Sequence, residues 1–158
     1  MTRVLTALAC LALAAHSIAT ANDEISFDDV PENVLDMAIR TAPGVTFERV
    51  SIEMENGRAI YEFEATDHAG RHIEIDVDED GRLEEIEMET DLADVPARVL
   101  ATLEEVAPGF SPTYIELSVR DTAPFYVYEF EGVAGGREVD IEITEDGDFL
   151  FLSDDLSS

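Results

Sequence analysis

The sequence contains no lysine, so arginine supplies all of its strongly basic side chains. Nine Arg stand against 37 Asp and Glu, which gives a formal net charge of −28 at pH 7. Such a surface repels phosphate groups, so nucleic acid is excluded as a partner and anionic membrane surfaces are disfavoured. The same charge attracts cations and basic proteins and keeps a protein soluble at high salt. Composition alone leaves both readings open, a charge for binding and a charge for solubility.

Long apolar runs are also missing, except for one near the start from Val4 to Ala15. Arg3 precedes it and the small residues "ATA" end at Ala21, which is the pattern of a secretory signal peptide. A bilayer-spanning helix needs about 20 apolar residues, so we expect no stable membrane insertion. The sequence therefore predicts a signal peptide at residues 1–21, cleaved near Ala21, and a periplasmic or secreted protein.

Cysteine is represented only by Cys10, which lies inside this apolar run. Removal of the signal peptide would leave no cysteine, which excludes disulfides, thiol catalysis and cysteine-ligated zinc together. Retention of Cys10 as a lipid attachment site is the weaker alternative. The sequence also has no G-x-S-x-G, no Ser or Cys nucleophile paired with an available His, and no glycine-rich phosphate loop. We therefore expect no catalytic residues and no enzymatic activity.

The chain contains a tandem internal similarity. The offset between matching blocks is 65 to 67 residues, and such a fixed period indicates duplication. We predict one repeat at residues 22–91 and another at 92–158. The matching blocks are "DVPENVLDMAIRTAPGV" (29–45) with "DVPARVLATLEEVAPGF" (94–110), "IYEFEA" (60–65) with "VYEFEG" (127–132), and "GRHIEIDVDEDGRL" (70–83) with "GREVDIEITEDGDF" (136–149).

Each repeat is expected to form one helix followed by four strands. Asp29 and Glu32 have the spacing of a capping box, and the helices should end before Pro43 and Pro108. The following segments alternate between apolar and acidic residues, which predicts strands with one acidic face. The expected fold class is α+β, with two tandem repeats that each pack one helix on a four-stranded antiparallel sheet. A unit of this size is marginal alone, so the units should share a core or a continuous sheet.

These motifs resemble the PepSY and PepSY-like superfamily. The resemblance is carried by a helix ending in "APG", then "YEFE", then "GRHIEIDVDEDG" or "GREVDIEITEDG", and covers about residues 29–152. Tandem units of this kind also resemble the beta-lactamase inhibitory protein and its proposed inhibitor-like relatives. The resemblance implies an exported, non-enzymatic module that binds or inhibits a partner protein, often a peptidase. It brings no catalytic residue.

The stretch "DVDEDGRLEEIE" (76–87) matches the calcium-loop template D-x-D-x-D-G-x5-E. The candidate ligands are carboxylates close together in sequence, as calcium prefers. Against this, the second repeat keeps only the "EDG" turn, and the segment before the loop has the period of a strand. A hairpin turn is therefore the competing interpretation. The candidate calcium ligands are Asp76, Asp78, Asp80, Glu84 and Glu87.

A second metal hypothesis concerns His68 and His72, which flank a predicted turn among carboxylates and could hold a transition metal. The second repeat has no histidine at either position. The sequence thus favours an exported binding module whose partner is an unidentified exported protein, such as a peptidase, and which needs no cofactor. The alternative is a calcium-responsive binding protein that uses the loop at 76–87.

Overall fold

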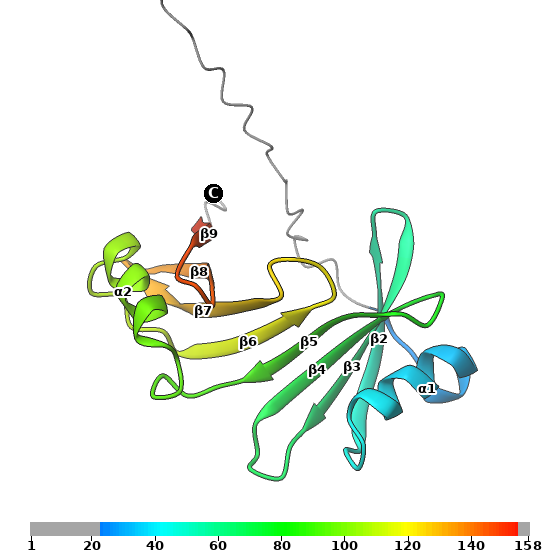
Figure 1. The fold of residues 1–158 in the computed structure, drawn as a ribbon. Helices are drawn as coiled ribbons and strands as arrows, with labels where there is room; N and C mark the ends of the chain where they lie inside the picture. Colours follow the sequence, from blue (N-terminus) through cyan, green and yellow to red (C-terminus); the bar gives the residue numbers. More distant parts are fainter. Residues whose placement is uncertain (1–22, 155–158) are drawn as a thin grey trace, which may run out of the picture.

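The computed structural model describes residues 23–154, which form one antiparallel sheet with two α-helices (Figure 1). The nine strands lie in the sheet in chain order, so each pairs with its sequence neighbours. Neither described helix is long and apolar enough to cross a membrane. The predicted signal peptide lies outside the described residues. The strands are β1 Asp23–Glu24, β2 Phe47–Glu55, β3 Arg58–Thr66, β4 His72–Asp78, β5 Leu83–Glu89, β6 Tyr114–Arg120, β7 Tyr126–Ala134, β8 Arg137–Thr144 and β9 Phe149–Asp154; the helices are η1 Phe27–Asp29, α1 Glu32–Thr41 and α2 Ala97–Val106.

The predicted fold class, two tandem repeats each with its own helix on a four-stranded sheet, is wrong. The protein has a single nine-stranded sheet, because β5 pairs with β6 across the predicted repeat boundary, with Glu85 opposite Arg120 and Met88 opposite Leu117. An exposed strand edge leaves N–H and C=O groups unpaired, and joining the edges satisfies them. The additional strand β1 pairs with β2. The boundaries 22–91 and 92–158 stay a prediction.

Both helices pack on the same face of this sheet. Val34 and Ala38 of α1 pack in one hydrophobic cluster with Phe63 and Ile75. A second cluster joins Val99 and Leu103 of α2 to the strands β6 to β8, around Phe130 and Ile141. Cross-strand pairs such as Ile86 with Val119 continue this apolar face from one cluster to the other. Because side chains alternate along each strand, the acidic residues between these apolar ones face the opposite side.

The helix ends differ partly from expectation. The predicted capping box does not form, since Pro31 is the N-cap of α1 and makes no side-chain cap bond. Asp29 lies instead in the short helix η1, whose N-cap Ser26 accepts a hydrogen bond from the Asp28 amide at 3.3 Å. The C-terminal ends of both helices are as predicted: α1 and α2 stop at Thr41 and Val106, directly before the Ala-Pro-Gly segments.

The tips of two hairpins rest on the helices. Gly81 and Gly147 both have positive φ, as the predicted "DG" turns require. A Cβ on Gly81 would lie 3.0 Å from the Asn33 carbonyl oxygen, and one on Gly147 would lie 3.2 Å from the Arg98 carbonyl oxygen. Thr102 of α2 donates a hydrogen bond to the Gly147 carbonyl at 2.7 Å. Each turn thus fixes the sheet against one helix.

Candidate functional site: the acidic sheet face

The sheet face opposite the helices is lined by carboxylates, and we call it the acidic face. Its composition follows from the strand register, in which acidic residues of neighbouring strands stand opposite one another. No helix within residues 23–154 covers it, since both helices pack on the other side. The acidic face comprises Glu62, Glu64, Glu74, Asp76, Glu85, Glu87, Glu89, Glu116, Glu129, Glu131, Asp140 and Glu142.

Arg120 on β6 organises the centre of this face. Its guanidinium donates from Nε to Glu85 Oε1 at 2.8 Å and from Nη2 to Glu129 Oε1 at 2.9 Å. Nη1 lies 3.4 Å from Glu142 Oε2, and the Glu142 side chain is almost fully buried. Ser118, which is completely buried, also bonds Glu85. One cation therefore serves three carboxylates, and the local charge stays negative.

Crowding on this face raises the pKa of several carboxyl groups. Burial, followed by repulsion from Glu62 and Glu64, raises the pKa of Glu74 to about 8. Burial and then Glu142 raise the pKa of Glu129 to about 8. Burial likewise raises the pKa of Glu62 to about 7, although Ser51 donates a hydrogen bond to it at 2.8 Å. An external cation or a basic partner near these groups would favour their charged form and lower their pKa values again.

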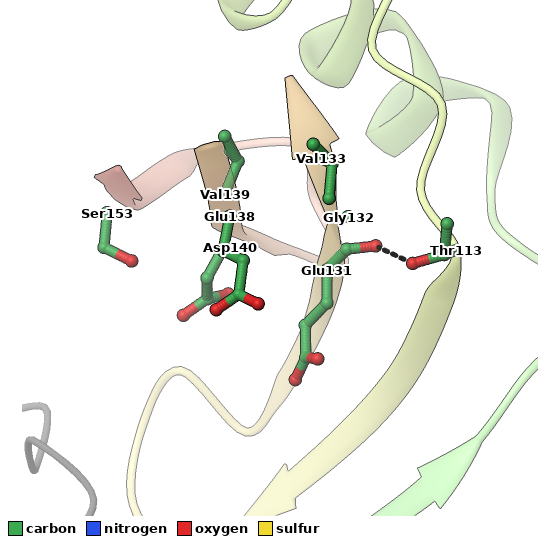
Figure 2. Close-up of a pocket in the computed structure, with 8 residues that line it drawn as sticks. All are labelled: Thr113, Glu131, Gly132, Val133, Glu138, Val139, Asp140 and Ser153. Atoms are coloured by element: carbon green, nitrogen blue, oxygen red, sulfur yellow. Dashed lines mark hydrogen bonds between the residues drawn. The ribbon is translucent and has the colours of Figure 1, made fainter. Parts of the chain in front are cut away.

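The face ends in a hollow of about 430 Å³ at strands β7 to β9. Figure 2 shows the carboxylates of Glu131, Glu138 and Asp140 extending into the same region from neighbouring strands, with Ser153 on β9 facing them. Burial, followed by repulsion from Glu116 and Asp140, raises the pKa of Glu131. No basic side chain lines this hollow among the described residues. Its shape and charge suit a cationic side chain of a bound partner.

The candidate calcium ligands are divided between the hairpin turn and the acidic face. Asp78 is completely buried, and its Oδ1 accepts the backbone amides of Asp80 and Arg82 at 3.0 and 2.9 Å, which closes the turn. Arg58 contacts Asp78 Oδ2 at 3.2 Å and Glu84 at 3.1 Å. Asp80 is exposed at the tip of the hairpin. Three of the candidate ligands thus belong to the turn and its ion pairs.

Asp76 and Glu87 lie instead on the acidic face. Asp76 stands between Glu62 and Glu85 on the neighbouring strands, and its Oδ1 is buried with no hydrogen-bond partner within the described range. Burial, followed by repulsion from Glu74, raises the pKa of Asp76 well above its usual value. Glu87 gathers with Glu85 and Glu129 and not with the turn. A calcium site at the five predicted residues stays a prediction.

The two histidines of the second metal hypothesis lie in different surroundings. His72 on β4 lies between carboxylates of the acidic face, with Nδ1 3.5 Å from Glu116 and Nε2 3.8 Å from Glu64. His68 lies in the loop before it, beside a hollow of about 270 Å³.

Arg120 and Glu129 are site residues that the sequence analysis does not single out. The alternation of the strands would have placed both on the acidic face, but only the β5–β6 register brings them to Glu85.

Three solved structures have a similar fold. A BLIP-like protein from Bacteroides fragilis has a TM-score of 0.64 at 18% identity, over 81% of this chain and 88% of that one. A predicted periplasmic protein from Bacteroides eggerthii has a TM-score of 0.66 at 12% identity, over 79% and 88%. A DUF2874 family protein from Bacteroides uniformis has a TM-score of 0.63 at 13% identity, over 78% and 88%.

These likenesses establish a shared BLIP-like fold over most of each chain. No protein-family model matches the sequence, and no curated protein matches it significantly. The resemblance to the PepSY superfamily is therefore not shown. The chain has the fold of a BLIP-like protein.

Proposed function

We propose that this chain is an exported, non-enzymatic binding module whose acidic face binds a basic segment of another exported protein. The observation that carries the proposal is the excess of carboxylates on a sheet face that no described helix covers. Arg49 pairs with Glu64 and Arg120 with three carboxylates, but no arginine pairs with Glu74, Glu87 or Glu131 within the described residues. A basic partner would supply the missing charge and would associate quickly because of electrostatic steering.

Two further observations support export and binding. The sequence begins with the pattern of a signal peptide, and one protein of similar fold is described as periplasmic. The hollow beside Glu131 and Asp140 offers a place for one cationic side chain of the partner. The extended, open face suits a strand or loop more than a small molecule, which usually binds in a more enclosed cavity.

A defined basic peptide tests the location of binding. We would measure the affinity for an extended peptide of alternating Arg and Val by calorimetry at 0.15 M NaCl. At pH 9, where Glu74 with its pKa of about 8 is ionised, the double variant Glu74→Gln/Glu131→Gln removes two charges from the acidic face and should weaken binding about tenfold. The matched control Asp36→Asn/Glu104→Gln removes two exposed charges from the helices and should change the affinity little. Equal losses in both variants would contradict a site on the acidic face.

The finer proposal is that the partner is an enzyme, such as a peptidase, and that binding inhibits it. The motif resemblance to PepSY proteins, which occur as propeptides of thermolysin-type peptidases, motivates it. The test is the hydrolysis rate of a thermolysin-type peptidase at increasing concentrations of this protein. Saturable inhibition that Glu74→Gln/Glu131→Gln weakens would support it. Binding of the basic peptide without inhibition of the peptidase would reject the inhibition proposal and would leave the binding proposal unaffected.

A further inference from the structure

The centre of the acidic face contains a convergence of three carboxylates that the basic-partner proposal does not need. Glu85 and Glu87 on β5 and Glu129 on β7 each offer an oxygen, and these oxygens lie within 4.8 Å of one another. The intervening strand β6 places Ser118 opposite Glu87, and Ser118 also bonds Glu85. Of these three residues only Glu87 is among the five predicted calcium ligands, and the set joins strands β5 and β7, which are distant in sequence.

Two of the three ligands are already held in place. Arg120 bonds Oε1 of Glu85 and Oε1 of Glu129, and Ser118 also donates to Glu85. Both bonds from Arg120 use Oε1, so neither carboxylate spends its Oε2 on this arginine. Ligands fixed by other groups in this way are pre-organised, which lowers the cost of binding a metal.

The third carboxylate and its neighbour lack partners. Glu87 accepts no hydrogen bond from the described part of the chain. Asp76, directly opposite Glu85 in the strand register, has a buried Oδ1 without any hydrogen-bond partner within residues 23–154. Buried polar oxygens are normally satisfied, so each exception calls for an unseen partner. One such oxygen, Asp76 Oδ1, lies beside the three-carboxylate cluster and points to a cation there.

We propose that Glu85, Glu87 and Glu129 bind a divalent cation, with Asp76 beside them, and that Ca²⁺ fits best. Ligand oxygens on opposite sides of Ca²⁺ lie about 4.6–5.2 Å apart, since each Ca–O distance is about 2.3–2.6 Å. The three ligand oxygens lie within 4.8 Å of one another, so one Ca²⁺ can reach all of them at these bond lengths. Mg²⁺ requires shorter distances of about 2.0–2.1 Å in a strict octahedron and gives up its water reluctantly, so it should bind these carboxylates more weakly. When all three carboxyl groups are ionised, they and Arg120 together carry two negative charges for the ion to neutralise.

The test is Ca²⁺ titration of the purified protein by calorimetry at pH 8 and 0.15 M NaCl, with Mg²⁺ in parallel. We expect one saturable Ca²⁺ site, weaker Mg²⁺ binding, and a loss of about tenfold or more in Ca²⁺ affinity for Glu87→Gln. Asp80→Asn removes the same charge from the exposed hairpin tip and should leave the affinity unchanged. Absence of a saturable site, or an equal loss in both variants, would overturn the proposal.

Thermal unfolding shows whether Glu87 is a metal ligand or only a residue that stabilises the fold. In chelator, Glu87→Gln should melt at the same or a higher temperature than the unchanged protein, because it removes an unpaired charge from a crowded face. In excess Ca²⁺ the unchanged protein should gain several degrees and Glu87→Gln should not. If Glu87→Gln lowers the melting temperature in chelator and keeps the gain in Ca²⁺, Glu87 is a structural residue and the site is rejected.

Discussion

Gly81, at the tip of the β4–β5 hairpin, meets two separate demands. Its φ of +80° lies in the left-handed region, and a Cβ there would come within 2.7 Å of the Asn33 side chain and 3.0 Å of the Asn33 carbonyl oxygen. Gly57, in the β2–β3 turn, has nearly the same φ of +83° but nothing within 4 Å of a Cβ. A comparison of substitutions at the two positions therefore distinguishes the cost of backbone strain from the cost of disturbing the contact between the turn and α1.

We predict that Gly81→Ala costs more stability than Gly57→Ala. A left-handed alanine costs about 1–2 kcal/mol, which both variants should lose. Gly81→Ala should lose a further 1 kcal/mol or so, because the Asn33 backbone must move away from the new methyl group. Urea unfolding of the two variants measures the difference. Equal losses would mean that the turn does not rest on the helix.

Asp78 matches the calcium-loop motif but has a structural role in the hairpin turn. Its carboxylate fits the calcium template, yet both oxygens are engaged, Oδ1 by two backbone amides and Oδ2 by Arg58. The same residue type at the same spacing serves a turn, since Asp side chains accept amides two residues ahead. The second copy of the stretch has Thr144 at this place, and its Oγ1 accepts the Asp148 amide at 3.1 Å. Comparison of the two similar stretches thus identified the hairpin turn. It did not identify the groups that bond to the side chain at this position.

At the scale of the elements, continuity of the sheet decides how the chain unfolds. The two hydrophobic clusters, around Phe63 and Phe130, lie on one face and are joined by the β5–β6 pairing. Both phenylalanines are completely buried. Because a break at β5–β6 would expose two strand edges at once, we expect the halves to unfold together.

Phe130→Ala tests this cooperativity. Removing a fully buried phenylalanine should lower the free energy of unfolding by about 3–5 kcal/mol. In a single cooperative unit, the most protected amides of β2 to β4 should lose as much protection as those of β6 to β8. Hydrogen exchange followed by mass spectrometry measures both regions in one experiment. Loss confined to β6–β9 would show that the sheet behaves as two units.

The elements were largely predictable, whereas for their assembly the sequence predicted only a shared core or a continuous sheet, without deciding between them. Alternation of apolar and acidic residues predicted eight of the strands, and Pro43 and Pro108 predicted where the helices stop. Joining β5 to β6 depends on backbone hydrogen bonds, which leave no mark in side-chain periodicity. Strand β1 has two residues, too few to show a period. Likewise, the alternation predicted an acidic wall, but only the register brings Arg120 to its three carboxylates.

At the scale of the whole molecule, the acidic face makes stability depend on pH. Burial raises the pKa of Glu74 and Glu129 to about 8, and that of Glu62 to about 7. In the unfolded chain a Glu titrates near 4.3. Between these values the folded protein holds protons that the unfolded chain has released, so its stability is full below about pH 4 and falls as the pH rises through 7 to 8.

We predict that the melting temperature in chelator is higher at pH 5 than at pH 8, by several degrees, since one pKa unit corresponds to about 1.4 kcal/mol. The Glu74→Gln variant should show a smaller difference, because one of the titrating groups is gone. Calorimetric scans at the two pH values measure it. A melting temperature that rises from pH 5 to pH 8 would contradict the crowding of the acidic face.

The central claim is that the acidic face, and not the general negative charge, is the binding surface. The most direct measurement is an NMR amide-shift map of isotope-labelled protein titrated with the alternating Arg and Val peptide. Our account predicts that shifts concentrate on β4 to β8, around Glu74, Glu87 and Glu131, and leave α1 and α2 nearly unchanged. Shifts spread evenly over the exposed acids, or centred on the helices, would show that the charge serves solubility and that the acidic face is not a binding site.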